Sequence, residues 1–412
     1  MKLTTKRSFI YLFIAILFIS LFFRYAHRAP KRHYCDFSVY YATAQRFIAK
    51  EDIYSRPDEA ITPFKYSPLF AYLVSPLSLI SQKTASLIFF SISFFSLIVI
   101  LVLSKKLIVK EALTFKQSIL LYALPTIFTS RFIFSVLDSG QVTIIMFLFV
   151  ILGLYFAEKK KNILASLFLG LSLMFKYTSV LFLPYFVFRK KIIIVTLTLV
   201  FIGLYCFLPA IHLGLGQEMQ YLKKWLPFIS EASLDKGSWF DSKNQSLYSF
   251  ILRLFAKDSA FKPIAQLTFF QGVAVATAIG LIMYLLIILP GRKNKNNTFI
   301  DYSLILICMA LFNPNAWLAN FVFFVFAYMV IAHHLIKVRY KDKVTLVLMI
   351  LSFIVSSWVS ESMVGDKLQN LFEALSTVTI AALILVGILL RLKFKKEITK
   401  SQDTIILKDR PR

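Results

Sequence analysis

Long apolar segments recur along the whole chain, separated by short polar stretches that are rich in lysine and arginine. A helix of about 20 apolar residues spans a bilayer and satisfies all its backbone hydrogen bonds internally. The pattern therefore predicts an all-α polytopic membrane protein with about 12 transmembrane helices. They are expected at roughly 8–23, 84–104, 117–133, 140–157, 162–175, 178–188, 192–210, 266–289, 299–317, 319–337, 343–359 and 370–390.

The basic clusters predict how these helices are oriented. They lie at 105–110, 159–161, 189–191, 292–295 and 337–343, and after residue 391. The positive-inside rule places such short loops in the cytoplasm. All of them can lie there only if an even number of spans precedes Lys105. The apolar run at 69–80, which is short and contains Pro76, is therefore predicted to be a re-entrant or surface helix.

This topology predicts one integral membrane domain at 1–390 and a basic cytoplasmic tail at 391–412. Both termini are then cytoplasmic, because the N-terminal apolar segment lacks a convincing cleavage site and is interpreted as a retained helix. Large outer loops are expected at 25–83, with amphipathic or re-entrant helices, and at 211–265. We expect a multi-pass protein of the cell membrane, surrounded by membrane lipids.

Composition agrees with a membrane protein. Of the 412 residues, 58% are hydrophobic, and 47 Lys and Arg against 21 Asp and Glu give a net charge of +26. In a soluble protein this charge would suggest nucleic-acid binding. Here the basic residues fall in predicted cytoplasmic loops, so no nucleic-acid partner is expected.

Residues 162–188 contain a lysine between two short apolar segments. Lys176 stands at their joint, and basic clusters flank both outer ends. The segment is either one long helix with a buried lysine or a hairpin whose tip reaches the outer face. The flanking clusters favour the hairpin.

The first outer loop carries the most informative polar residue. From Phe37, apolar side chains recur at 37, 40, 41, 44, 47 and 48, which predicts a helix lying on the membrane. Asp36 directly precedes this helix, so it is either an N-cap or a reactive carboxylate. The two roles are compatible, because one oxygen can cap the helix while the other faces a cavity.

Cations near the outer face are candidate anion-binding groups. Lys176, Arg131 and Lys65 qualify, since charges at membrane depth are costly. Snorkelling to the interface is the alternative for each. Asn313 and Asn315 flank Pro314 and predict a helix break, where polar backbone must line a cavity or water. We found no zinc spacing or carboxylate cluster, so neither a metal nor a cofactor is expected.

Several short motifs resemble glycosyltransferase family 87, of the polyprenyl-phosphate-mannose-dependent α-1,2-mannosyltransferase type within the GT-C superfamily. They occur in family order between about residues 8 and 330. Trp317 is followed by Leu318-Ala319-Asn320, whereas the family commonly has histidine there, and Tyr66-Ser67-Pro68 replaces the usual Tyr-Pro-Pro. The matching pieces are Asp36-Phe37-Ser38-Val39-Tyr40-Tyr41, Phe64-Lys65-Tyr66-Ser67-Pro68 with Pro76-Leu77, Gly140-Gln141-Val142, Gly170-Leu171 followed by Lys176, and Asn244-Gln245-Ser246-Leu247.

The resemblance implies a GT-C-like membrane glycosyltransferase that moves a hexose, with mannose favoured, from a polyprenyl-phosphate donor to a lipid or glycan hydroxyl. Asp36 would be the general base of an inverting transfer at the extracytoplasmic face. Lys176, Arg131 and Lys65 would bind the donor phosphate. The acceptor and sugar cavity would be lined by Tyr40, Tyr41, Tyr66, Gln141, Asn244, Gln245, Trp317 and Asn320.

Two other classes of function remain open from the residues alone. A transporter or flippase of a lipid-linked or anionic solute would use the same charges along a translocation path. Such proteins usually show internal repeats and paired broken helices, and we found only outer-face features. A non-catalytic scaffold in the cell envelope is the third hypothesis.

Overall fold

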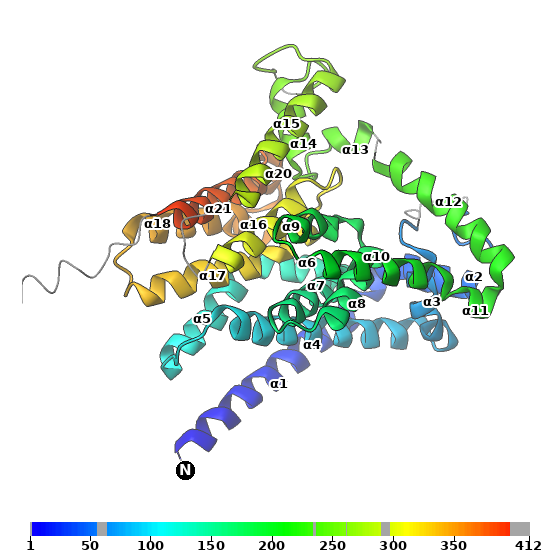
Figure 1. Ribbon diagram of the computed structural model, residues 1–412, viewed down its shortest axis with the longest axis horizontal. Coiled ribbons are helices and arrows are strands. Elements are labelled where there is room, and N and C mark those ends of the chain that lie inside the picture. Colours follow the sequence, from blue (N-terminus) through cyan, green and yellow to red (C-terminus); the bar gives the residue numbers. More distant parts are fainter. Residues whose placement is uncertain (1, 56–63, 234–235, 261, 290–296, 396–412) are drawn as a thin grey trace, which may run out of the picture.

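The computed structural model describes residues 2–55, 64–233, 236–260, 262–289 and 297–395, and within them the regular elements are helices (Figure 1). Extended pairing in these ranges is limited to an isolated bridge between Ala256 and Leu267. The predicted all-α class is confirmed for this part of the chain. Residues 396–412 of the predicted tail lie outside the described ranges.

Five helices in the described part are long and apolar enough to cross a bilayer, and a bent pair would make a sixth. The expected count of about 12 spans is therefore not confirmed. The bent pair consists of α5 (Phe115–Phe128) and α6 (Ser130–Ser139), which meet at 64°. The five are α4 (Gln82–Ile108), α10 with α11 (Ile192–Phe207 and Ala210–Leu213), α15 (Phe269–Ile288), η4 with α17 (Leu318–Phe323 and Phe324–Lys337) and α21 (Thr377–Phe394).

The other apolar segments form shorter helices. At 1.5 Å per residue, 14 residues extend over about 21 Å, less than the ~30 Å of hydrocarbon. The run at 69–80 is one of them, as expected. They are α3 with η2 (Pro68–Val74 and Ser75–Leu79), α7 (Thr143–Glu158), α8 (Asn162–Phe175), η3 with α9 (Tyr177–Leu181 and Phe182–Phe188), α16 (Asn297–Leu311) and α18 with the π-helix η5 (Lys343–Phe353 and Ile354–Trp358).

Polar and amphipathic helices complete the fold. Within the first predicted outer loop, η1 (Pro30–Arg32) and α2 (Cys35–Ile48) follow α1 (Lys2–Arg28), which contains the first predicted span. The second predicted outer loop contains α12, α13 and α14, and the C-terminal part adds α19 and α20. Their bounds are Leu215–Ser233, Lys236–Phe240, Leu247–Phe255, Glu361–Val364 and Asp366–Ala374.

Helix α17 forms the centre of the molecule. In the span that η4 and α17 form, 94% of the most apolar 18 residues are buried inside the protein, whereas the value for the span of α10 and α11 is 17%. Side chains of α5, α16, α18 and α21 pack around α17. A helix can thus be apolar on all sides because protein covers it, while α10 keeps an apolar surface for lipid.

Charged contacts bring several basic loops to one end of the molecule. Lys191 Nζ lies 3.0 Å from Glu158 Oε1, which joins the loops at 158–161 and 189–191. Asp301 lies 2.5 Å from Arg189 Nη2 and 2.8 Å from Lys393 Nζ, which adds the start of α16 and the end of α21. This grouping supports one shared membrane face for these loops. That the face is cytoplasmic stays a prediction.

The predicted hairpin at 162–188 is confirmed. Helix α8 ends at Phe175, Lys176 is extended with φ −148° and ψ 125°, and η3 and α9 lead back. The Lys191–Glu158 contact holds the returning end beside the start of α8. Lys176 is therefore at the tip, far from the basic loops.

Candidate active site

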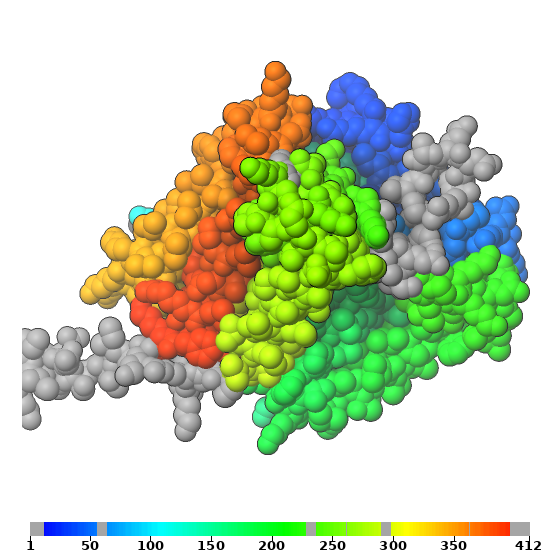
Figure 2. Space-filling model, turned by 90° about the horizontal axis from the view of Figure 1, so that it is seen from above, coloured from blue at the N-terminus to red at the C-terminus, as the bar shows by residue number. Residues whose placement is uncertain are grey.

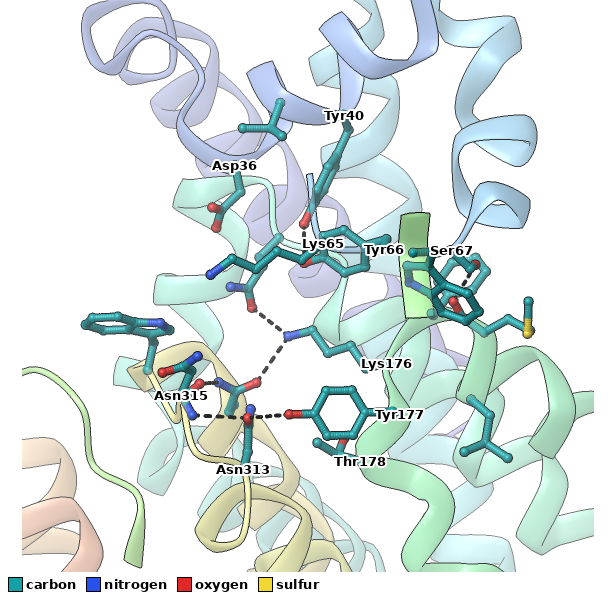
Figure 3. A pocket seen from close by; sticks show the side chains of 18 residues that line it. Asp36, Tyr40, Lys65, Tyr66, Ser67, Lys176, Tyr177, Thr178, Asn313 and Asn315 are labelled. Carbon is teal, nitrogen blue, oxygen red and sulfur yellow. Dashed lines mark hydrogen bonds between the residues drawn. The ribbon is translucent and has the colours of Figure 1, made fainter. Parts of the chain in front are cut away.

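One cavity at the tip of the α8–α9 hairpin gathers side chains from distant parts of the sequence (Figure 3). Its volume is about 200 Å³. The walls come from α2, the segment before α3, the α6–α7 turn, the hairpin tip, α12 and the loop after α16. Of the predicted site residues, the cavity brings together Asp36, Tyr40, Lys65, Tyr66, Gln141, Lys176, Trp317 and Asn320.

A tight chain reversal places Asp36 in the first turn of α2. The preceding residues 33–35 have φ values of 48°, 57° and 44°, and none of them is glycine. The left-handed region costs an L-residue about 1–2 kcal/mol, and strain of this kind often accompanies functional sites. The reversal therefore fixes where α2 begins and where Asp36 points.

Gly140 allows α2 to approach the turn that carries Gln141. Gly140 has φ +65° and ends α6. A Cβ added there would lie 2.8 Å from Cβ of Phe37, the residue after Asp36. Glycine thus satisfies both the left-handed backbone and the close contact. This packing explains the Gly140-Gln141 motif.

The electrostatics of Asp36 suit a general base. Burial raises the pKa of the Asp36 carboxyl above its ordinary value, and positive charge on Lys176 is the strongest opposing influence. Ser139, Gln141 and Lys65 also lower this pKa. A carboxylate whose pKa moves toward the working pH accepts a proton more effectively than an ordinary one.

Lys176 is held by three acceptors inside the cavity. Its Nζ donates to Thr143 Oγ1 at 2.6 Å, Asn320 Oδ1 at 3.1 Å and Gln141 Oε1 at 3.3 Å. Burial lowers the pKa of Lys176 to about 8, and the negative charge of Asp36 opposes this shift. Lys176 therefore supplies a fixed positive charge in a largely dry site at neutral pH.

The segment before α3 connects α2 to the hairpin tip. Tyr66 Oη lies 2.8 Å from Tyr40 Oη, and Ser67 Oγ donates to Met174 O at 2.6 Å. Ser67 also accepts from Phe70 N and so caps α3. Lys65, the remaining polar residue of this segment, extends between Asp36 and Lys176 in Figure 3.

The loop after α16 forms the opposite wall and is held by Asn244. The side chain of Asn244 donates to Pro314 O at 2.7 Å and accepts from Ala316 N at 3.2 Å. Within the loop, Asn320 Nδ2 donates to Asn315 O at 3.3 Å. Asn244 is thus a support for the cavity wall rather than part of it.

Gln245 and Tyr41 also lie outside the cavity lining. Gln245 Nε2 donates to Glu373 O at 2.8 Å, and Gln245 O accepts from Thr379 Oγ1 at 2.8 Å, which ties the second predicted outer loop to α20 and α21. Tyr41 Oη donates to Ile80 O at 2.8 Å and holds α2 against η2. Both residues contribute to the support of the site.

Arg131 is placed away from the cavity by a buried ion pair. Its Nη2 lies 2.8 Å from Glu373 Oε1, and its Nη1 donates to Ser356 O at 2.9 Å. The two charged side chains are 6% and 3% exposed. Arg131 therefore joins α6 to α20 and to η5, and its guanidinium is already engaged.

The cavity also contains polar residues that sequence reasoning did not assign to the site. Tyr177 and Thr178 follow Lys176, and proximity to that lysine was a usable signal. Asn313 and Asn315 belong to the predicted helix break. Trp225, on α12, had no signal, because a tryptophan in an amphipathic helix usually only marks the membrane interface.

The arrangement combines a half-buried carboxylate, a fixed cation and neutral hydrogen-bonding groups around one cavity. It can accept a proton from a hydroxyl and stabilise negative charge on a departing group. A search of the described residues for clusters of three or more His, Cys, Asp or Glu side chains found none that could hold a metal ion.

Comparison with known proteins identifies a family. The model for glycosyltransferase family 87 matches residues 64–314. No curated protein and no solved structure matches the chain. The matched range includes the lining residues from Lys65 to Asn313. It excludes the lining residues of α2 and, on the opposite wall, Asn315, Trp317 and Asn320.

Proposed function

Because this chain belongs to glycosyltransferase family 87, we propose that it transfers a hexose, with mannose favoured, from a polyprenyl-phosphate donor to a hydroxyl of a lipid or glycan acceptor. The reaction takes place at the extracytoplasmic face of the membrane. The observation that carries the proposal is that Asp36 and Lys176 line one cavity and influence each other's charge.

Asp36 acts as the general base. The acceptor oxygen attacks the anomeric carbon of the hexose on the side opposite the phosphate, and its proton passes to the Asp36 carboxylate. The bond between that carbon and the phosphate oxygen breaks, so the polyprenyl phosphate leaves with the electron pair. The configuration at the anomeric carbon is inverted. General-base catalysis of this kind contributes about 10²- to 10⁴-fold.

Lys176 and Lys65 stabilise the departing phosphate. A phosphate is a good leaving group, so cations that balance its charge can replace a general acid. Lys176 is preorganised by its three hydrogen bonds, while Lys65 is exposed and extends between Asp36 and Lys176 (Figure 3). The Arg131–Glu373 pair leaves Arg131 in a structural role, so we assign the donor phosphate to the two lysines.

The test is a transfer assay with the full chain in lipid nanodiscs. It uses a radiolabelled short-chain prenyl-phosphate mannose as donor and octyl α-mannoside as acceptor. We expect a labelled disaccharide product whose anomeric configuration, read by NMR, is opposite to that of the donor. Absence of product, together with movement of the labelled donor across proteoliposome membranes, would instead support the transporter hypothesis.

A further inference from the structure

Two neutral polar atoms in the cavity wall lack partners within the described part of the chain. They are Thr178 Oγ1 and Trp225 Nε1, and both atoms are shielded from solvent. Thr178 itself is 7% exposed. A buried donor without a partner costs about 1–3 kcal/mol, so each such atom calls for an explanation, and these two are the ones that belong to residues of the cavity wall within the described part of the chain.

The hydroxyl of Thr178 makes no hydrogen bond to the carbonyl where a threonine most often finds one. A threonine near a helix often donates to the carbonyl four residues earlier. For Thr178 that carbonyl is Met174 O, which accepts from Ser67 Oγ at 2.6 Å. Met174 O thus bonds to Ser67, and Thr178, which lines the cavity, makes no hydrogen bond to it.

Trp225 is held in place by the contacts of α12. Lys224, its neighbour, has Nζ 2.6 Å from Asp52 Oδ2, and Tyr221 Oη donates to Glu51 O. These contacts tie α12 to the segment that follows α2, the helix of Asp36. Figure 2 shows the green surface of α12 bordering the blue surface of the N-terminal segments along one edge. Trp225 is thus a fixed part of the wall.

We infer that Trp225 Nε1 and Thr178 Oγ1 form a sugar subsite, in which they bind hydroxyl groups of a hexose. Both groups are neutral, and an indole adds a flat apolar face beside its N–H donor. A phosphate would be drawn to the charge of Lys176, whereas neutral donors match a neutral polyol. The inference rests on the proposed function and deepens it, and the hexose can belong to the donor or to the acceptor.

Binding measurements test the subsite without requiring turnover. Trp225→Phe keeps an aromatic ring and removes the N–H, and Thr178→Val removes the hydroxyl with little change in shape. The control Trp239→Phe alters a buried tryptophan that packs on Tyr248 and Phe269. The probes are prenyl-phosphate mannose, octyl α-mannoside and prenyl phosphate without sugar, each titrated into the full chain in nanodiscs.

We expect each of the two variants to raise the Kd of a mannose-bearing probe about 5- to 10-fold, as loss of one hydrogen bond implies. Prenyl phosphate alone should bind within twofold of its wild-type Kd, as should all probes with Trp239→Phe. If only the binding of prenyl-phosphate mannose is weakened, the subsite holds the donor sugar. If only the binding of octyl α-mannoside is weakened, it holds the acceptor sugar.

The inference would be overturned if the affinity for both mannose probes were unchanged. It would also be overturned if the binding of prenyl phosphate were weakened as much as the binding of the mannose probes. Thr178→Ser, which retains the hydroxyl, should bind like the wild type and provides a second comparison if the valine variant does not fold. Failure of the proposed function would look different. Wild-type protein would then form no product, while the binding differences between variants could still be measured.

Discussion

Lys176 Nζ donates to Asn320 Oδ1 at 3.1 Å and so joins the hairpin tip to the loop of the opposite wall. The two residues are 144 positions apart in sequence. Asn320 belongs to the stretch Leu318-Ala319-Asn320 that follows Trp317, whereas the resemblance to the family would place one or two histidines after the tryptophan. In this chain an amide therefore orients the cation, and no imidazole is needed at that position to hold Lys176.

The charge of Lys176 should control the alkaline limb of the pH–activity profile. Burial lowers the pKa of Lys176 to about 8, so its positive charge is present below that pH and is lost above it. We expect kcat/KM for the donor to fall as pH rises through about 8. Lys176→Arg, which stays charged, should shift this limb to higher pH, and Lys176→Met should lower kcat/KM about 10- to 100-fold at neutral pH. An unchanged limb in the arginine variant would exclude Lys176 as its source.

Asp36 should control the acidic limb. Transfer needs the ionised carboxylate, and burial raises the pKa of Asp36, so activity should decline at a higher pH than for an ordinary aspartate. Lys176 lowers this pKa, and Lys176→Met should therefore move the acidic limb further upward. The pH dependence of single-turnover rates measures both effects. A limb that stays in place in Lys176→Met would show that the two charges are not coupled.

Gly140→Ala should damage both stability and transfer. The new Cβ would lie 2.8 Å from Cβ of Phe37 at a residue with φ +65°. We expect a loss of about 1–3 kcal/mol in the free energy of unfolding and slower transfer, because Asp36 would shift. The control is Gly203→Ala, where a Cβ meets nothing within 4 Å. Similar thermal unfolding of the two variants would argue against the close contact.

Substitution of Arg131 should affect the stability of the fold rather than the binding of the donor. Removing one partner of a buried ion pair costs about 3–5 kcal/mol, since the other charge is left unpaired. We expect Arg131→Met to lower the unfolding temperature, and Glu373→Met added to it to restore most of the loss. Donor Kd in the double variant should match the wild type. A persistent defect in donor binding would return Arg131 to the phosphate site.

Glu218 makes stability depend on pH. Its side chain on α12 is fully buried, and both carboxylate oxygens lack partners within the described residues. Burial raises the pKa of Glu218 to about 7, with Tyr54, Tyr221 and Cys206 nearby. The folded protein thus holds a proton that the unfolded chain loses above about pH 4.3.

The free energy of unfolding should therefore fall as pH rises from about 4.3 toward 7 and level off above. Glu218→Gln, which cannot ionise, should remove this decline. Thermal unfolding in nanodiscs across that range measures the effect. An identical decline in the glutamine variant would assign it to another group.

The sequence predicted the helices better than the number of spans, and it named several residues that line one cavity. Hydropathy marks α16 as apolar, but it cannot distinguish a helix covered by protein from one exposed to lipid, and α16 is almost entirely buried. The hairpin at Lys176 was predictable because basic loops flank both of its ends. The amphipathic pattern after Asp36 likewise predicted α2.

Other parts of the site depend on contacts that a sequence does not reveal. Arg131 and Glu373 are 242 residues apart, so nothing near Arg131 indicated that its charge was already paired. Asn244 and Gln245 matched a motif but act by holding neighbouring loops. Trp225 enters the cavity only because α12 folds back onto the segment after α2.

The most direct measurement separates binding from chemistry in Asp36→Asn. Single-turnover transfer and the Kd of prenyl-phosphate mannose are measured in nanodiscs for the wild type, Asp36→Asn and Asp258→Asn. Asp258 is an exposed aspartate of the second predicted outer loop. The account predicts that Asp36→Asn binds donor within about threefold of the wild type and transfers about 10²- to 10⁴-fold more slowly, while Asp258→Asn is unaffected. Near wild-type transfer by Asp36→Asn would contradict the assignment of Asp36 as the general base.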